Sequence, residues 1–252
     1  MRVLVALWLL LVAGVAQAQE GIVAGLSQNR VSITADFDGS EILIYGAVKR
    51  DSPAPDGRVE VIITVEGPAG PLVIRRKARQ AGIWVNSDAV QVDRAPSFYV
   101  VATTGPLHQI LTETENLRHR IAAPRAIRAV GISAEAEGAP EFITALLRIR
   151  EAEGQYRLAE RSIEMTEQTL FRADVVLPAN LTEGNYRVRI FLTRNGEVID
   201  TLERLINVRK EGLERFLYNL AQEQPLIYGL LALLIAVVAG WAASAAFRYI
   251  RF

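Results

Sequence analysis

Two long apolar runs lie near the two ends of the chain. Residues 226–247 contain no charged side chain over 22 positions. At about 1.5 Å of rise per residue, a helix of that length crosses a hydrocarbon core of about 30 Å. The pattern predicts a transmembrane helix over residues 225–247 and a short tail of residues 248–252. The lipid bilayer is therefore the first expected partner, and the working part of the protein precedes the span.

The N-terminal apolar run is shorter and has the layout of a secretory signal peptide. Arg2 precedes ten apolar residues at positions 3–12, and Ala16-Gln17-Ala18 matches the small-x-small cleavage pattern. A signal peptide is predicted over residues 1–18, with an uncut N-terminal anchor as the alternative. Export places residues 19–224 outside the cytosol. We therefore expect a single-pass membrane protein with an exported N-terminal domain and a cytoplasmic C-terminus.

The first part of the exported region has the pattern of short strands separated by turn residues. Strands are predicted at residues 41–49, 59–66, 72–75, 83–85, 90–92 and 98–103. Asp51-Ser52-Pro53-Ala54-Pro55-Asp56-Gly57 has the composition of a hairpin loop. Several short strands at close spacing favour a β-sandwich, so residues 19–105 are predicted to form an N-terminal β-rich domain.

The middle of the chain changes to helical spacing. Residues 106–120 carry apolar positions at helical intervals, and residues 140–153 do so more strongly. Pro140 lies in the first turn of the second helix, and Gly154 follows its end. Residues 106–154 are therefore predicted to be a helical connecting segment.

Strands resume at residues 156–165 and 169–177. Leu181, Gly184 and Tyr186 then form the Leu-x-x-Gly-x-Tyr pattern of a tyrosine corner. Asn195-Gly196 predicts a two-residue hairpin turn into a last strand at residues 197–208. Residues 155–210 are thus predicted to be a C-terminal Ig-like β region. The expected fold is mainly β, with Ig-like β-sandwich regions, inserted helices and one C-terminal transmembrane helix. One composite domain and two separate β domains both remain open.

A juxtamembrane amphipathic helix is predicted over residues 211–224. Leu213, Phe216, Leu217 and Leu220 recur at i, i+3, i+4 and i+7. This stripe could rest on the membrane surface or dock on the sandwich. Docking is favoured because the polar face is not rich in basic residues.

Composition narrows the function classes. The 28 basic residues include Arg2, Arg248 and Arg251, so 25 remain against 28 acidic residues in the exported part, a net charge of −3. This balance argues against a nucleic-acid partner. The chain has no cysteine, which excludes disulfides, thiolate metal sites and redox dithiols. No cofactor is predicted.

Trp84 and Asn86, in the segment Gly82-Ile83-Trp84-Val85-Asn86, are a candidate ligand surface. A tryptophan beside a turn could line a carbohydrate or peptide groove, but a tryptophan of the sandwich core is the favoured interpretation. The basic run at residues 75–79 could meet lipid headgroups or an acidic partner. A solvated hairpin tip is the favoured interpretation of that run.

Two other motifs are weak. Residues 36–41 have part of a calcium-loop pattern, but an Asp-Gly turn between strands explains them better. His108 and His119 lie roughly on one face if residues 106–120 form one helix. Two histidines without thiolate or thioether neighbours make a poor transition-metal site, so both are expected to be ordinary polar residues. No catalytic or metal residue is predicted, and the protein is not expected to be an enzyme.

The predicted span carries a pattern of its own. Ala232, Ala236, Gly240 and Ser244 repeat every four residues. Small residues at this spacing let helices approach closely in lipid. These four residues, called the ridge below, are a candidate partner interface, and a plain alanine-rich anchor is the alternative.

Short motifs occur in a fixed order along the chain: GIWVN at 82–86, PSFY at 96–99, TLFRA at 169–173, LPA at 177–179, GxY at 184–186, YG at 228–229 and GW at 240–241. With them the mature chain resembles a family of alphaproteobacterial transmembrane proteins that have a single C-terminal span. The resemblance implies a single-pass protein of a bacterial inner membrane, with a periplasmic N-terminal domain and a cytoplasmic C-terminus. It also implies an accessory role beside a permease of the sulfite/sulfonate exporter type, and it supplies no catalytic residues. Two hypotheses follow: an accessory module that contacts a membrane protein such as a permease, or a tethered domain that binds a glycan or an oxyanion.

Overall fold

A computed structural model of the chain describes residues 20–34, 36–50, 56–128, 139–211, 218 and 220–250, with side chains of the last helix up to Ala246. The chain divides into two compact units. The β-rich unit comprises residues 1–31 and 38–208, and the membrane unit comprises residues 32–37 and 209–252. The predicted signal peptide at residues 1–18 lies outside the described residues.

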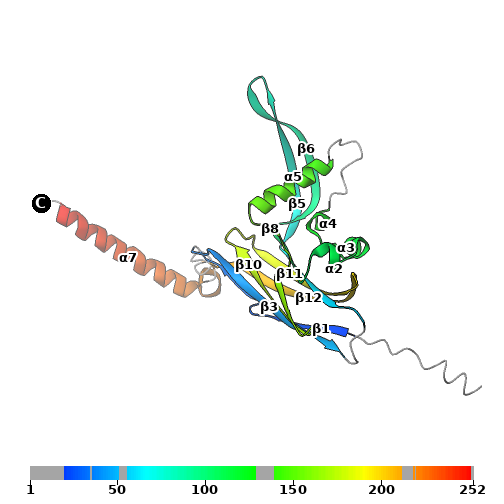
Figure 1. The fold of residues 1–252 in the computed structure, drawn as a ribbon. Coiled ribbons are helices and arrows are strands. Elements are labelled where there is room, and N and C mark those ends of the chain that lie inside the picture. Colours follow the sequence, from blue (N-terminus) through cyan, green and yellow to red (C-terminus); the bar gives the residue numbers. More distant parts are fainter. Residues whose placement is uncertain are drawn as a thin grey trace, which may run out of the picture. The chain divides into compact units, whose positions relative to one another are not determined.

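Three sheets contain all the described strands (Figure 1). The first is antiparallel, in the order β1 (Glu20–Leu26), β3 (Gly39–Arg50), β10 (Leu170–Pro178) and β9 (Ile163–Thr166). The second has the order β2 (Arg30–Ile33), β12 (Glu197–Lys210), β11 (Gly184–Arg194), β4 (Val59–Glu66), β7 (Tyr99–Thr103) and β8 (Tyr156–Ala159). The third is a two-stranded hairpin of β5 (Ala69–Gln80) and β6 (Ile83–Pro96).

The predicted fold class, mainly β with a C-terminal apolar helix, is confirmed. Strand β4 has the predicted bounds, and β3 contains residues 41–49. The hairpin predicted between them is wrong, because β3 belongs to the first sheet and β4 to the second. Residues 51–57 therefore connect two sheets, and residues 51–55 of this connection lie outside the described residues.

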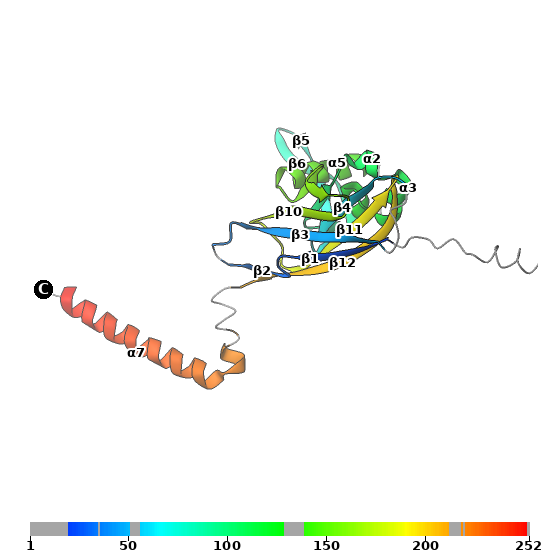
Figure 2. The same ribbon diagram turned by 60° about the horizontal axis from the view of Figure 1, so that its bottom comes forward.

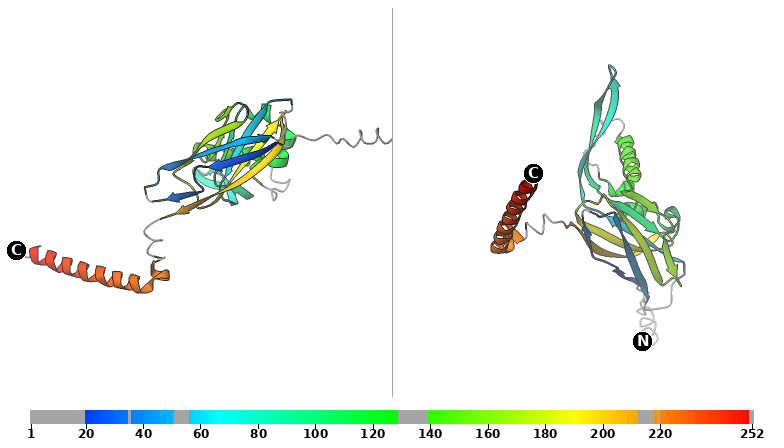
Figure 3. Two further views of the ribbon diagram at one scale, coloured as in Figure 1. Left: turned by 90° about the horizontal axis from the view of Figure 1, so that it is seen from below. Right: turned by 90° about the vertical axis from the view of Figure 1, so that its left-hand side faces the viewer.

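The two predicted β-rich ranges contribute strands to the same sheets. Phe171 of β10 pairs with Gly46 of β3, and Ile190 of β11 pairs with Ile63 of β4. The first and second sheets form two layers, visible in Figures 2 and 3. This composite arrangement is compatible with an Ig-like sandwich.

The tyrosine-corner prediction is confirmed. The hydroxyl of Tyr186 donates a hydrogen bond of 2.9 Å to the carbonyl oxygen of Thr182, four residues upstream. The predicted hairpin turn is confirmed as well, since Asn195 and Gly196 have φ of 51° and 83° and connect β11 to β12. Positive φ at both central residues is the geometry of a type I′ turn, whose twist matches that of the flanking strands.

Alternation of side chains explains which faces of the strands are buried. In β10, Phe171, Ala173, Val175 and Leu177 are buried, whereas Arg172 is exposed. In β4, by contrast, Val61, Ile62 and Ile63 are all fully buried. A strand that is buried on both faces needs a layer on each side.

Helices supply the second layer over the central strands. They are α2 (Leu107–Ile110), α3 (Glu113–His119), α4 (Ala123–Ala126) and α5 (Ala139–Ala152). Ile121 between α3 and α4, and Phe142 and Leu146 on α5, cluster with Ile62 of β4 and Phe191 of β11. The predicted connecting segment is therefore part of a hydrophobic core.

The first predicted helix is divided in two, and the second is confirmed. Within residues 106–120 the helix is interrupted before Thr112. The side chain of Thr112 accepts a hydrogen bond from the amide of Glu115 and caps α3. The α5 helix matches the prediction, and Gly154 follows it with a φ of 71°. Phe142 and Leu146 of α5 are buried, whereas Ile149, one turn further on, is half-exposed.

The C-terminal helix α7 (Pro225–Ile250) contains a 22-residue stretch, Pro225–Ala246, with a mean hydropathy of 2.4. Among the described residues it is the one helix long and apolar enough to cross a membrane. Of the predicted juxtamembrane stripe, Leu213, Phe216 and Leu217 lie outside the described residues.

Candidate functional site

The β5–β6 hairpin is long and has two different halves. Apolar side chains near its base join the core that contains Phe142 and Leu146. They are Leu72, Ile74, Val90 and Val92. Its closed end extends past α5, as Figures 1 and 3 show. The turn is formed by Ala81 and Gly82, with φ of 49° and 87°. The sequence prediction placed short separate strands at residues 83–85 and 90–92, but both belong to β6.

Arg76 marks the point where the hairpin leaves the core. Its guanidinium lies 4.7 Å from the centre of the Phe142 ring and forms an ion pair of 2.7 Å with Glu141, both on α5. The strand register shifts between Arg76 and Lys77, as in a β-bulge. Residues 77–87, beyond this irregularity, are called the arm tip below.

The arm tip exposes large apolar side chains. Ile83 is 64% exposed and Trp84 is 69% exposed. The favoured interpretation of Trp84 as a core residue is therefore wrong, because the hairpin carries it beyond the helices that cover the base. The solvated-tip interpretation of the basic run agrees with the structure, since Arg75, Lys77 and Arg79 are exposed.

The strand register brings together two candidates that the sequence analysis treated separately. Arg79 pairs with Trp84, and Lys77 pairs with Asn86. Directly paired residues lie on the same face of a sheet, and so do residues two apart on one strand. Lys77, Arg79, Trp84 and Asn86 therefore share one face of the arm tip. The signal for this pairing in the sequence is Gly82, a turn residue between the two strands.

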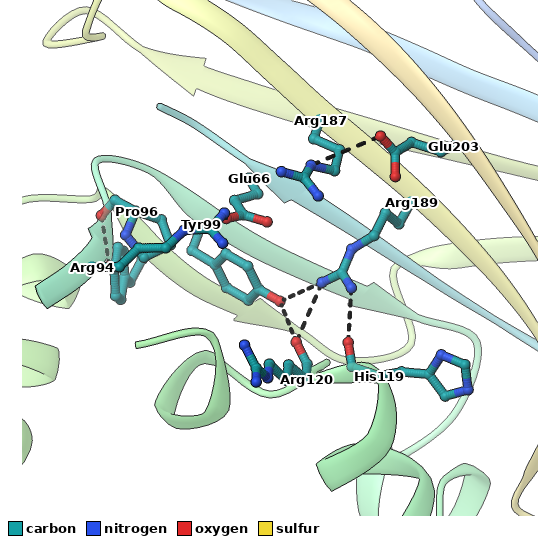
Figure 4. A network of polar contacts seen from close by, with 10 residues as sticks. Glu66, Arg94, Pro96, Tyr99, His119, Arg120, Arg187, Arg189 and Glu203 are labelled. Atoms are coloured by element: carbon teal, nitrogen blue, oxygen red, sulfur yellow. Dashed lines mark hydrogen bonds and ion pairs between the residues drawn. The ribbon is translucent and has the colours of Figure 1, made fainter. Parts of the chain in front are cut away.

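A second group of polar residues lies on the outer side of the second sheet (Figure 4). The hydroxyl of Tyr99 is 2.8 Å from the carbonyl oxygen of Ile121 and 3.1 Å from that of Arg120. Arg189 donates hydrogen bonds of 2.7 Å to the carbonyl oxygen of His119 and 3.3 Å to the hydroxyl of Tyr99. Arg189 points away from the inter-sheet core, and the end of α3 covers it.

Burial, the largest cause, raises the pKa of Tyr99 to about 12. Burial likewise raises the pKa of Tyr156, whose hydroxyl donates a hydrogen bond of 2.6 Å to the carbonyl oxygen of Pro96. Both phenols are therefore protonated at neutral pH. Each donates a hydrogen bond to a backbone carbonyl oxygen.

A cavity of about 320 Å³ lies next to this group, lined by Glu66, Gly67, Pro68, Ala69, Arg94, Asn185, Arg187 and Leu205. Arg94 forms an ion pair of 2.8 Å with the buried Glu66. Arg187 is half-exposed and lies 3.9 Å from Glu203, which is a long ion pair (Figure 4). Because Glu66 offsets the charge of Arg94, the guanidinium of Arg187 is the group best placed to bind a carboxylate or another oxyanion.

The sequence analysis missed this cavity and its network. The cavity residues come from β4, β5, β6, β11 and β12 and from the connection between β4 and β5, and Tyr99 of the network comes from β7. No short motif joins Glu66, Arg94 and Arg187, so local pattern gave no signal for the site.

The two histidines lie on separate helices, so the single helix face predicted for them is wrong. His119 is 3.4 Å from Glu115 and packs edge-on against Phe191. Within the part of the chain that the structure describes, no cluster of three His, Asp or Glu residues could hold a metal ion.

All four ridge residues, Ala232, Ala236, Gly240 and Ser244, are exposed on α7. A methyl group added at Gly240 would meet no atom within 4 Å. Within the membrane unit, therefore, no described side chain occupies the ridge.

Two comparisons with known proteins bear on identity. The search of curated proteins found no match. The family described as "Putative transmembrane protein (Alph_Pro_TM)" matches residues 21–249, which include almost all of the described chain and the apolar helix. This match confirms the resemblance stated from the sequence motifs. The chain belongs to this alphaproteobacterial transmembrane family, and it is a membrane protein with one C-terminal apolar helix.

Proposed function

We propose that the protein is a membrane-anchored periplasmic accessory module that works by contact with an inner-membrane protein such as a permease. The observation that carries this proposal is the exposure of α7. No residue of its most apolar stretch is buried inside the protein. Lipid or another helix must cover this surface, and the ridge offers a place where a second helix can approach closely.

The proposed orientation rests on the two ends of the sequence. A signal peptide at residues 1–18 would export the chain until residues 225–247 stop it. The β-rich unit would then face the periplasm of a bacterial inner membrane, and residues 248–252 would remain cytoplasmic. Fusion of a periplasm-dependent reporter to the C-terminus, compared with a fusion after residue 210, tests this arrangement.

The test is co-purification of the full-length protein in mild detergent, followed by crosslinking and mass spectrometry. We expect one dominant membrane-protein partner, which Gly240→Leu should release by filling the ridge. Ala242→Leu is the matched control, because about 100° of rotation per residue places Ala242 roughly opposite the ridge. If the Gly240→Leu protein retained every partner of the wild type, the ridge would not be the interface.

The alternative is a tethered periplasmic domain that binds a glycan or an oxyanion. The cavity beside Arg94 and Arg187, and the exposed Trp84 and Asn86, favour this alternative. It predicts that a soluble sugar, sulfate or sulfonate raises the melting temperature of the full-length protein in detergent. Arg187→Gln should remove the effect of an oxyanion, whereas the exposed Arg148→Gln should not. The absence of any shift across the panel would count against this alternative.

A further inference from the structure

The arm tip is an exposed apolar end on an otherwise folded hairpin. Ile83 and Trp84 follow the turn directly, and both keep more than half of their surface in water. Apolar side chains gathered at an exposed tip mark a surface that another phase or molecule covers. Trp is also a side chain that favours the boundary between lipid and water, where its ring is apolar and its N–H can be hydrated.

All the charged residues of the arm tip are basic. Within residues 77–87 the charged residues are Lys77 and Arg79, and Arg75 and Arg76 directly precede them. Arg76 is held by Glu141 of α5, whereas Arg75, Lys77 and Arg79 have no ion-pair partner in the described part of the chain. This end of the hairpin is therefore positive, and it complements an anionic surface.

The basic and apolar side chains lie together. Cross-strand pairing puts Arg79 opposite Trp84, and Lys77 opposite Asn86, on one face. Ile83 is on the other face of the ribbon, next to the turn. Such a tip can place two apolar side chains below a layer of anionic headgroups while Lys77 and Arg79 remain among the phosphates.

The chain tethers the β-rich unit to the apolar helix α7. Residues 211–224 join the end of β12 to the start of α7. At about 3.4 Å per residue, this connection spans at most about 50 Å. Tethering of this kind replaces a bimolecular encounter with an intramolecular one, so weak lipid contacts are sufficient.

From these observations we propose that the arm tip, residues 77–87, inserts Ile83 and Trp84 into the interface of an anionic lipid bilayer, with Lys77 and Arg79 bound to its phosphates. Insertion of the tip gives the β-rich unit a second membrane contact besides α7. This role is independent of the accessory function proposed above, because it needs lipid and no partner protein.

The test uses the fluorescence of Trp84 in the full-length protein. The chain has three tryptophans, so Trp8→Phe and Trp241→Phe leave Trp84 as the reporter. This protein is placed in nanodiscs of phosphatidylcholine alone, or of equal parts phosphatidylcholine and phosphatidylglycerol, each with and without brominated acyl chains. We expect a blue-shifted emission and bromine quenching in the anionic discs, and both should weaken as salt is added.

Two changes in the arm tip separate the contributions. Because each basic residue near an anionic surface contributes about 1 kcal/mol, or roughly a fivefold factor, Lys77→Gln with Arg79→Gln should lower the insertion equilibrium roughly 30-fold. Ile83→Ser should reduce quenching without changing its dependence on salt. The matched control is Arg148→Gln with Arg157→Gln, which removes two exposed cations outside the arm and should change nothing.

Three outcomes would overturn the proposal. Trp84 could be unquenched in anionic discs, or quenched equally in both lipid compositions. The control pair could lower quenching as much as the arm variant does. A blue shift that persists in detergent and grows with protein concentration would show that a second copy of the chain, and not lipid, covers the tip.

Discussion

The hydroxyl of Tyr99 lies 2.8 Å from the carbonyl oxygen of Ile121, and both side chains are fully buried. Tyr99 belongs to β7, and Ile121 follows α3. The bond thus fixes the helical layer to the second sheet at a place where water cannot replace either partner. Arg189 supports the same junction through its hydrogen bonds to the carbonyl oxygens of His119 and Arg120.

Tyr99→Phe should destabilise the β-rich unit by about 1–3 kcal/mol, because a buried carbonyl group would lose its donor. The measurement is urea unfolding of the detergent-solubilised protein, followed by circular dichroism. Tyr45→Phe is the control, since Tyr45 is half-exposed, and it should change stability by less than about 0.5 kcal/mol. Equal effects of the two substitutions would show that the junction does not depend on this bond.

Stability should fall at alkaline pH. In the unfolded chain the phenol of Tyr99 ionises near its ordinary pKa of 10.0, whereas burial raises the pKa of Tyr99 in the folded protein to about 12. The contribution is therefore complete below pH 10.0 and is lost as pH rises toward 12. Two pKa units correspond to about 2–3 kcal/mol.

Urea unfolding measured at a series of pH values, from neutral to about 12, tests this dependence. Burial raises the pKa of Tyr156 and Tyr186 as well, so the wild type should lose stability from several groups. The Tyr99→Phe protein should lose less stability over the same pH range, because it has no phenol at position 99 to ionise. Parallel curves for the two proteins would contradict the assignment to Tyr99.

Glu20→Gln should cost about 3–5 kcal/mol, because Glu20 is a buried carboxylate held by two arginines. Its oxygens lie 2.8 Å from Arg50 and 2.7 Å from Arg194. The substitution leaves both guanidinium groups without their anion. The exposed Glu197→Gln is the matched control, and a comparable loss there would refute a specific role of the buried ion pairs.

The lowered pKa of Glu20 also predicts that stability falls in acid. Burial opposes its ionisation, but the hydrogen bonds and charges of Arg194 and Arg50 outweigh burial and lower the pKa of Glu20 below 4.5. Its contribution is present above that value and is lost as pH falls through the lowered pKa. The Glu20→Gln protein should therefore lose less stability than the wild type on acidification. Acid titration of both proteins by circular dichroism measures the difference.

Gly196→Ala should destabilise the β11–β12 turn more than Gly154→Ala destabilises the end of α5. Both glycines have positive φ, so each substitution carries a backbone cost of about 1 kcal/mol. At Gly196 the new methyl would also lie 2.9 Å from Thr112, which caps α3 and whose amide donates to the Gly196 carbonyl. At Gly154 it would meet no atom within 4 Å. Thermal unfolding of the two variants gives the comparison, and equal losses would exclude a role for Thr112.

Several features could be predicted because their causes lie close together along the chain. The Tyr186 corner depends on a carbonyl four residues upstream, and the Asn195-Gly196 turn depends on two adjacent residues. The alternation of β10 follows from a period of two residues. The candidate cavity could not be found in this way, because Glu66 and Arg187 are more than 100 positions apart and meet only through the pairing of β4 with β11.

Sequence alone determined the apolar C-terminal helix, most of the strand segments and the class of the fold. Helix length, charge-free composition and local turn chemistry set those properties residue by residue. Tertiary structure decided which sheet each strand joins, the division of the helix at Thr112 and the exposure of Trp84. These outcomes depend on which distant segments cover a given face, and that is a property of the packed chain. Trp84 is exposed because the helices end before the hairpin does, and no pattern within residues 82–86 contains that information.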